Sequence, residues 1–500
     1  MNKTPRNIIA NFIGYGANLL FAAICIPFYI KLMGVEAYGL IGIFATIMAV
    51  VIPLDFGLST TFNREFAGDS ALTDKAGEMR DLLRTMQPVF FGTAVVICLA
   101  IVLVSSFVAQ HWLRPETFTK ETLQQTIAIM GIVVGLYWPI YLYTAGLAGL
   151  QRQALLNVIS VSMDFLRFCG GVAVLWTISP TAQAFFFWQA FVNLVHLYII
   201  AVALWSSLPR TGIKSRFRRD LLVKEWRFKT GLSGISIAAL VQTQADRILL
   251  SRIFSLRVFG YYSLAAMLAS GLSRIIGPIY TALFPRFTSL VARNEHERLV
   301  MAYHRGCQLM SVLVLPMATV IAVFSHEILL LWTRDSDTAD SAYLIVSMLT
   351  ISTALNGIAH LSYAIQLANK WTKLAFWGTV ITAALMVPSL VFMALRFGPV
   401  GAACVGVFIN GLGMVIGLWI MHSRFLKGEL RAWYMQDVAS PLAAVLGVVF
   451  IGRCVMNAAM PIIPMTISLL TITFMALLAA TLAAPLMRDW LLSRFCSLKS

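Results

Sequence analysis

Residues 27–41 read PFYIKLMGVEAYGLI, and residues 248–262, which read ILLSRIFSLRVFGYY, align with them without a gap. In each copy an apolar run ends in a basic residue, Lys31 or Arg252, and an aromatic residue followed by glycine opens the next run. Two similar segments at corresponding places predict an internal duplication, which is a common way of building large helical membrane proteins.

The rest of the chain consists largely of apolar runs. Of the 500 residues 59% are hydrophobic and 12% are charged, whereas a soluble protein carries about 25% charged residues. This composition excludes a soluble domain. A membrane-spanning helix needs about 20 apolar residues, and the first run is long enough to stay as an anchor instead of being cleaved as a signal peptide. We predict fourteen spans, at residues 8–29, 40–60, 87–108, 123–148, 153–176, 182–205, 231–251, 258–284, 303–325, 341–368, 374–395, 398–421, 436–456 and 462–486.

The net charge of +16 follows the predicted topology. With the N-terminus in the cytoplasm, and with Arg305 and Arg453 near span ends counted in the adjoining segments, 27 of the 38 Lys and Arg residues fall on the predicted cytoplasmic side and eight on the predicted external side. This asymmetry is the positive-inside rule, and it predicts that both termini are cytoplasmic. The basic charge therefore needs no nucleic-acid partner, and the sequence offers no base-reading motif.

Six spans separate the two copies of the repeat, and an even number returns the chain to the same side of the membrane. The halves are therefore expected to be parallel repeats. We predict an all-α polytopic fold with an N-terminal six-helix lobe at 1–205, a basic cytoplasmic linker at 206–230 and a C-terminal six-helix lobe at 231–422. Two additional transmembrane helices at 436–487 and a cytoplasmic tail at 488–500 complete the chain.

Three arginines lie well inside predicted spans, away from the span ends, and need anionic partners, because a guanidinium stays charged and its planar fork matches phosphate or carboxylate. Arg167 follows Asp164 by three residues, which favours an intrahelical ion pair over substrate binding. Arg247 adjoins Asp246, but helix neighbours point about 100° apart, so Arg247 lines a polar cavity or pairs with another helix. Arg274 has no acidic residue within four positions and is the best of the three for a diphosphate.

Three aspartates are candidates for ion coupling: Asp246, Asp55 and Asp164. A carboxylate inside the membrane can take up and release a proton, which favours Asp246 unless it forms a static pair with an arginine. Asp55 lies near the end of a predicted span, where helix capping is the favoured interpretation. Other polar residues in the spans line a cavity or, as we favour, bond between helices: Asn11, Asn18, Asn193, His196, Asn356 and His360.

Several sequence motifs are missing, and their absence narrows the range of possible functions. The seven cysteines show no metal-binding spacing, and no G-x-x-x-x-G-K-[ST] loop indicates ATP hydrolysis. The longest external loop, at 326–340, has about 15 residues, which leaves little room for a catalytic site outside the bilayer. We therefore expect a protein that is not an enzyme, with no catalytic or metal site. A membrane glycan polymerase or glycosyltransferase remains a less favoured alternative.

The chain resembles the polysaccharide transporter family, the O-antigen and repeat-unit flippases of the multidrug/oligosaccharidyl-lipid/polysaccharide exporter superfamily. The resemblance lies in residues 11–14 (NFIG), 27–39 (PFYIKLMGVEAYG), 54–58 (LDFGL), 148–152 (AGLQR), 244–252 (QADRILLSR) and 260–264 (GYYSL). It implies a V-shaped, two-lobed bundle whose lobes rock to move an undecaprenyl-diphosphate-linked oligosaccharide across the bacterial inner membrane. Coupling to a proton or sodium gradient is implied, without a bound cofactor.

In the family that the chain resembles, basic residues in the cavity hold the diphosphate. Arg247 and Arg274 match these residues in type and in depth within the membrane. The partners implied are the lipid-linked oligosaccharide, the bilayer, a polysaccharide polymerase and a chain-length regulator. The two extra C-terminal helices resemble those of lipid II flippases, whose cavity is more basic than three arginines supply. We therefore favour an O-antigen or exopolysaccharide repeat-unit flippase, and the alternative is an ion-coupled antiporter of the multidrug and toxin extrusion type.

Overall fold

The computed structural model describes residues 3–55, 57–69, 75–209, 215–218, 233–456 and 460–490. Within them every regular element is a helix, which confirms the predicted all-α class. The chain divides into two compact units. Unit 1 comprises Met1–Leu240 with Phe254–Gly260, and unit 2 comprises Val241–Ile253 with Tyr261–Ser500. Of the predicted linker at 206–230, the structure describes only 206–209 and 215–218. The domain boundaries predicted from the sequence stay predictions.

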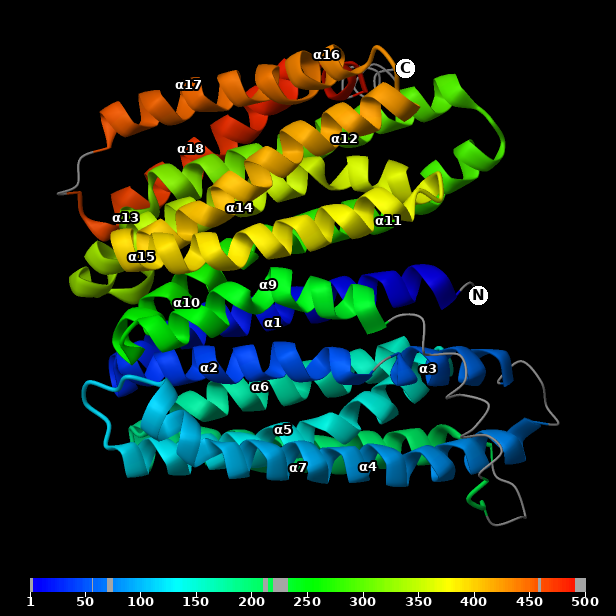
Figure 1. Ribbon diagram of the computed structural model, residues 1–500, viewed down its shortest axis with the longest axis vertical. Helices are drawn as coiled ribbons and strands as arrows, with labels where there is room; N and C mark the ends of the chain where they lie inside the picture. The colour runs from blue at the N-terminus through cyan, green and yellow to red at the C-terminus, as the bar shows by residue number, and fades with distance from the viewer. Residues whose placement is uncertain are drawn as a thin grey trace. The chain divides into compact units, whose positions relative to one another are not determined.

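Unit 1 is a bundle of long helices that lie alongside one another (Figure 1). Its elements are α1 (Lys3–Met33), α2 (Val35–Val51), the 3-10 helix η1 (Ile52–Asp55), α3 (Leu58–Asp69), α4 (Ala76–Phe107), the π-helix η3 (Val108–Trp112), α5 (Lys120–Gly149), α6 (Gln153–Thr177) and α7 (Ala182–Ser207). The sequence did not predict α3, because it is short and too polar to resemble a span.

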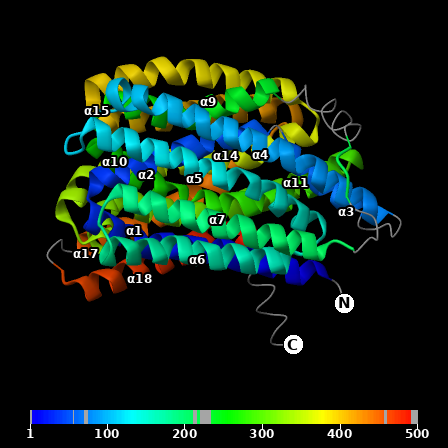
Figure 2. The ribbon, with the colours of Figure 1, turned by 90° about the horizontal axis from the view of Figure 1, so that it is seen from below.

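Helix α5 is the centre of unit 1. It packs against α3, α4 and α7, and Figure 2 shows it between α4 and α7. Trp138 and Leu142 of α5 are buried in the core. Gly149 brings the helices close together, since a Cβ at this position would lie 2.6 Å from the Cβ of Phe66 on α3. Small residues at such crossings are what allow membrane helices to approach closely.

The regular elements of unit 2 are also helices. Helices α9 (Ser233–Ile253) and α10 (Leu256–Ser270) belong to it from Val241 and from Tyr261 onward, respectively. The others are α11 (Ser273–Ala292), α12 (His296–Val323), α13 (Ser325–Thr333), α14 (Ser336–Ala368), α15 (Thr372–Phe425), α16 (Leu430–Ala432), the π-helix η4 (Trp433–Ala439), α17 (Ser440–Val455) and α18 (Ile462–Ala483). Helix α14 packs against α11, α12, α13 and α15. The two C-terminal helices, α17 and α18, pack against each other and against α12.

The described residues contain twelve continuous helical stretches long and apolar enough to cross a membrane. One of them, Thr372–Phe425, holds two helices, because Gly398 adopts φ 66° and ψ −157° between them. That break lies where the sequence separates the predicted spans 374–395 and 398–421. Helix α9 lies at the predicted span 231–251 and is not one of the twelve. With these two additions the structure is consistent with the predicted fourteen spans.

The two copies of the sequence repeat meet each other reciprocally. A Cβ at Gly39 would lie 2.4 Å from the carbonyl oxygen of Leu256, and a Cβ at Gly260 would lie 2.3 Å from the carbonyl oxygen of Val35. In the alignment Gly39 corresponds to Gly260 and Val35 corresponds to Leu256. All four residues belong to unit 1. Equivalent residues therefore make equivalent contacts, as in a self-complementary interface, which supports the internal duplication.

Candidate functional site

The predicted site residues divide between the two units. Asp55, Asp164 and Arg167 belong to unit 1, and Asp246, Arg247 and Arg274 belong to unit 2. We describe each set within its own unit. No group of three or more His, Cys, Asp or Glu side chains that could hold a metal ion occurs among the residues described.

In unit 1, Asp164 and Arg167 of α6 form the ion pair expected from their spacing. Arg167 Nη1 lies 2.7 Å from Asp164 Oδ1, and both side chains are 18% exposed. Asn18 of α1 donates to the other carboxylate oxygen at 2.8 Å. Arg167 Nη2 donates to Asn193 Oδ1 of α7 at 3.0 Å, and its guanidinium lies 5.6 Å from the ring centroid of Tyr137 on α5. The pair thus joins four helices.

The uncharged polar residues mostly serve as bonds between helices. Asn18 and Asn193 do so around the ion pair, and Asn193 Nδ2 also donates to the carbonyl oxygen of Val133 on α5 at 3.0 Å. Asn356 of α14 donates to Asn410 of α15 at 3.3 Å. The prediction of interhelical bonds is confirmed for these three residues. His196 is buried with neither ring nitrogen bonded within the described part of the chain, and the side chain of Asn11 lies outside that part.

Asp55 caps the start of α3. The backbone N–H of Ser59 lies 3.0 Å from Asp55 Oδ2 and 3.3 Å from Oδ1. A carboxylate that accepts from the first turn of a helix satisfies a donor that has no partner within that helix. The favoured interpretation of Asp55 as a cap is therefore confirmed. Its predicted part in ion coupling stays a prediction.

In unit 2, Asp246 and Arg247 have separate surroundings. The hydroxyl of Tyr262 on α10 donates to Asp246 Oδ2 at 2.9 Å. The second oxygen, Oδ1, is buried without a hydrogen-bond partner in the described residues. Arg247 has no acidic side chain within 4 Å among them. The polar face continues at Gln242, which donates to Thr382 of α15 at 3.2 Å.

Arg274 is the second residue of α11, directly after the turn at 271–272 that separates α10 from α11. The sequence predicted one uninterrupted span here, at 258–284. The Arg274 side chain is exposed within unit 2. Its guanidinium makes no hydrogen bond or ion pair with the residues described. Within the described part of the chain, Arg247 and Arg274 therefore both have guanidinium groups without an anionic partner.

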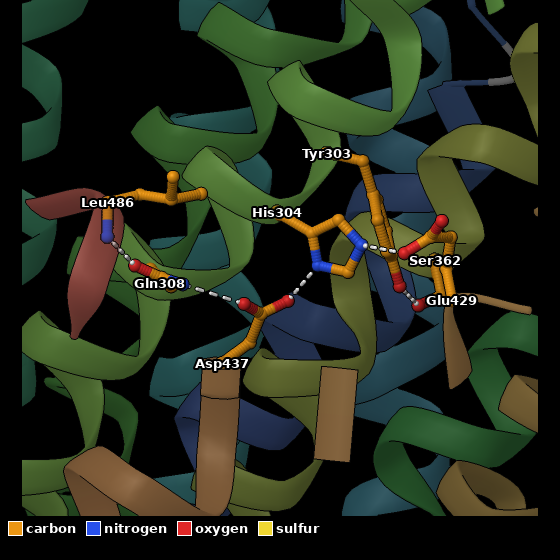
Figure 3. A network of polar contacts seen from close by, with 7 residues as sticks. All are labelled: Tyr303, His304, Gln308, Ser362, Glu429, Asp437 and Leu486. Carbon is orange, nitrogen blue, oxygen red and sulfur yellow. Dashed lines mark hydrogen bonds and ion pairs between the residues drawn. The ribbon is translucent and has the colours of Figure 1, made fainter. Parts of the chain in front are cut away.

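The structure also shows a polar network that the sequence did not indicate (Figure 3). His304 of α12 bonds through Nδ1 to Asp437 Oδ2 of η4 at 2.5 Å and through Nε2 to Glu429 Oε2 at 3.1 Å. Gln308, one turn further along α12, donates to Asp437 Oδ1 at 3.0 Å. The backbone N–H of Leu486 donates to Gln308 Oε1 at 2.8 Å.

This network fastens both C-terminal helices to α12, since η4 leads into α17 and Leu486 follows α18. Asp437 is 1% exposed, and each of its oxygens has a partner. A buried carboxylate with two partners is a packing and positioning element. The available signal was a charged residue inside the predicted span 436–456, one position after its start.

Comparisons with known proteins agree with the fold. A family model described as a polysaccharide biosynthesis protein matches residues 5–291. The chain is 19% identical over 366 residues to the lipopolysaccharide biosynthesis protein WzxC of Escherichia coli (strain K12), which covers 71% of this chain and 69% of that protein.

Two solved structures share the fold across most of the chain. A structure of the lipid II flippase MurJ in an inward closed conformation has a TM-score of 0.67 at 14% identity and covers 97% of this chain and 99% of that one. An inward-facing multidrug resistance transporter of the MATE family has a TM-score of 0.63 at 11% identity, with coverages of 83% and 94%. The family model spans more than half of the chain, and the helical architecture agrees with it: the chain belongs to the polysaccharide biosynthesis protein family.

Proposed function

We propose that the chain is a flippase that moves undecaprenyl-diphosphate-linked oligosaccharide repeat units across the bacterial inner membrane, for O-antigen or exopolysaccharide synthesis. The observation that carries the proposal is the pair of arginines in unit 2, Arg247 and Arg274. Both lie in helices of the predicted membrane region without an acidic partner among the described residues. A guanidinium that has no acidic partner can bind a diphosphate through paired N–H donors. The similarity to a lipopolysaccharide biosynthesis protein, WzxC, and to a lipid II flippase, MurJ, supports the proposal.

In this proposal the substrate's charged end is held by arginine, and its oligosaccharide is accommodated by many weak contacts. Alternating exposure of the binding site to the two leaflets moves the diphosphate without exposing it to the hydrocarbon core, where an uncompensated charge costs several kcal/mol. The protein forms and breaks no covalent bond in this process. The polymerase and the chain-length regulator that use the flipped product are its proposed partners.

Asp246 is the proposed coupling residue. One of its oxygens accepts from Tyr262, and the other is buried without a partner in the described residues. That free oxygen can accept a proton or bind a sodium ion. The oxygens of Asp164, by contrast, are held by Arg167 and Asn18. This difference favours Asp246 over Asp164 for coupling to an ion gradient.

The test is deletion of the gene, followed by extraction of diphosphate-linked glycans and labelling of intact cells with membrane-impermeant periodate. We expect complete repeat units to accumulate and to stay shielded from the label. Complementation with the parent gene must restore labelling. Unchanged glycolipid pools together with greater sensitivity to cationic toxic compounds would favour the antiporter. Labelled but unpolymerised units would favour a polymerase or glycosyltransferase, and either of these results would overturn the flippase proposal.

A further inference from the structure

A second group of arginines lies far along the chain from Arg247, at the connection between α11 and α12. A cavity of about 490 Å³ opens between the end of α11 and the start of α12. Four arginines line it: Arg286, Arg293, Arg298 and Arg305. Arg286 and Arg293 come from α11 and its C-cap, and Arg298 and Arg305 come from α12. All four side chains are exposed.

The helical period explains why these side chains share one groove. Arg286 and Arg293 are seven residues apart, as are Arg298 and Arg305, and positions seven apart lie on the same face of a helix. Seven residues span about 10.5 Å along the axis. The two helices pack as an antiparallel hairpin, in which a Cβ at Gly306 would lie 2.6 Å from a methyl carbon of Leu283. The guanidiniums therefore form two levels, with Arg293 and Arg298 near the tip and Arg286 and Arg305 further in.

The two levels differ in their partners. Near the tip, Arg298 Nη1 pairs with Glu295 Oε2 at 2.8 Å. Arg286 and Arg305 have no acidic side chain within 4 Å among the described residues. Like charges that line one cavity repel one another, and an anion between them removes that repulsion. The inner level thus has two guanidiniums available for one anion.

The cavity also has apolar lining. Leu290 and Ala302 contribute to it, and Met301, which also lines it, is 55% exposed. The hairpin joins two stretches that are each long and apolar enough to cross a membrane. We therefore expect its tip to lie at the headgroup level of the bilayer, on the side that the charge distribution predicts to be cytoplasmic. Arginine beside apolar surface at this depth suits a ligand that has both a phosphate and an acyl chain.

We propose that this cavity binds a phosphate group, held mainly by Arg286 and Arg305. A phosphate presents several acceptor oxygens, and each guanidinium binds two of them through parallel N–H donors. The same chemistry is carried by the headgroup of an anionic phospholipid and by a soluble phosphate. Arg286 lies on the same helix as Arg274, α11, but 12 residues further along it, or about 18 Å along the axis. The proposal does not depend on the proposed transport activity.

The full-length chain is purified in detergent and studied with two probes. Thermophoresis measures binding of inorganic pyrophosphate, and native mass spectrometry counts phosphatidylglycerol retained after reconstitution with phosphatidylcholine containing phosphatidylglycerol. We expect the double variant Arg286→Gln, Arg305→Gln to bind whichever probe the parent chain binds about tenfold more weakly than the parent does, a difference of about 1.4 kcal/mol. The matched control is Arg431→Gln, an exposed arginine outside the cavity, which should bind like the parent chain.

Binding of phosphatidylglycerol alone assigns the phosphate to a lipid headgroup, and binding of pyrophosphate alone assigns it to a soluble ligand. Binding of neither probe by the parent chain overturns the proposal, as does equal binding by the parent and the double glutamine variant. If that variant does not fold, the double lysine variant at the same positions replaces it. It keeps both charges but lacks the planar fork, so unchanged binding would show that the geometry of the two arginines is not recognised.

Discussion

Arg167 in unit 1 contacts Asp164 of its own helix, Asn193 of α7 and the ring of Tyr137 on α5. Arg247 and Arg274 in unit 2 have no anionic partner among the described residues. The three arginines are alike in type and in the apolar character of their helices. A guanidinium whose donors are already bonded within the protein stabilises the bundle, whereas one without an anionic partner is available to a ligand. Residue type and depth alone do not separate these two uses.

We expect the largest loss of stability when the ion pair of Arg167 in unit 1 is removed. Among the described residues, Arg167→Leu leaves the Asp164 carboxylate in an apolar bundle with Asn18 as its remaining partner, and we expect it to lower the free energy of unfolding by about 3 kcal/mol. Thermal denaturation in detergent, followed by loss of monodisperse protein, measures the change. The double variant Asp164→Asn, Arg167→Gln removes both charges and should recover most of the stability. Equal stability of Arg167→Leu and the parent would show that the pair does not hold the unit together.

The network at His304 tests whether unit 2 also contains charged groups that only stabilise. His304→Leu leaves the buried Asp437 with Gln308 alone, and it should lower the free energy of unfolding by about 2 kcal/mol. Limited proteolysis should then cut the region of α17 and α18 before the rest of unit 2, because their connection to α12 is weakened. Ser362→Ala, which removes only the hydrogen bond to Tyr303 at 2.7 Å, serves as the control. Proteolysis that begins elsewhere would contradict the assignment.

Neutralising Arg247 and Arg274 tests whether these arginines bind substrate, unlike Arg167, which binds other residues of the protein. Arg274→Gln and Arg247→Gln should each lower flipping of the lipid-linked substrate about tenfold, which corresponds to about 1.4 kcal/mol, with unchanged abundance in the membrane. The readout is periodate labelling in the deletion strain that carries each variant. Arg396→Gln changes an exposed arginine between the predicted spans 374–395 and 398–421, and this variant should flip the substrate normally. Normal flipping by both variants would remove these arginines from the site.

The smallest effects on stability are expected from two carboxylates changed to amides. Asp55→Asn retains a side-chain oxygen that caps α3, so stability should change by less than about 0.5 kcal/mol and flipping should be normal. Asp246→Asn keeps the bond from Tyr262 but removes the proton site, so we expect flipping in proteoliposomes to lose its response to an imposed proton or sodium gradient. A gradient response identical in both variants and the parent would place coupling elsewhere.

The sequence predicted the features that depend on residues close together along the chain. Apolar length located the spans, Gly398 lies at a predicted boundary, and the three-residue spacing of Asp164 and Arg167 indicated their pair. The sequence does not predict helix α13, because the helix lies mostly in the predicted external loop 326–340. The turn between α10 and α11 was missed because both flanks are apolar.

Contacts between distant residues could not be predicted. His304 and Asp437 are separated by 133 positions, and no periodicity links two residues on different helices. Asp246 was recognised as exceptional from its surroundings, but its partner Tyr262 lies on the next helix. The cationic cavity depends on the register of α11 against α12, which the packing at Gly306 determines.

The reciprocal contact of Gly39 and Gly260 has a consequence for biosynthesis. Domains generally fold as units from the N-terminus while the chain is still being synthesised. Unit 1, however, includes Phe254–Gly260, which follow α9 in the chain. The first half therefore cannot complete its packing when α7 leaves the ribosome. Its packing can be completed only after residue 260 has been translated. Residues 254–260, in the second copy of the repeat, are therefore the last part of unit 1 to be added.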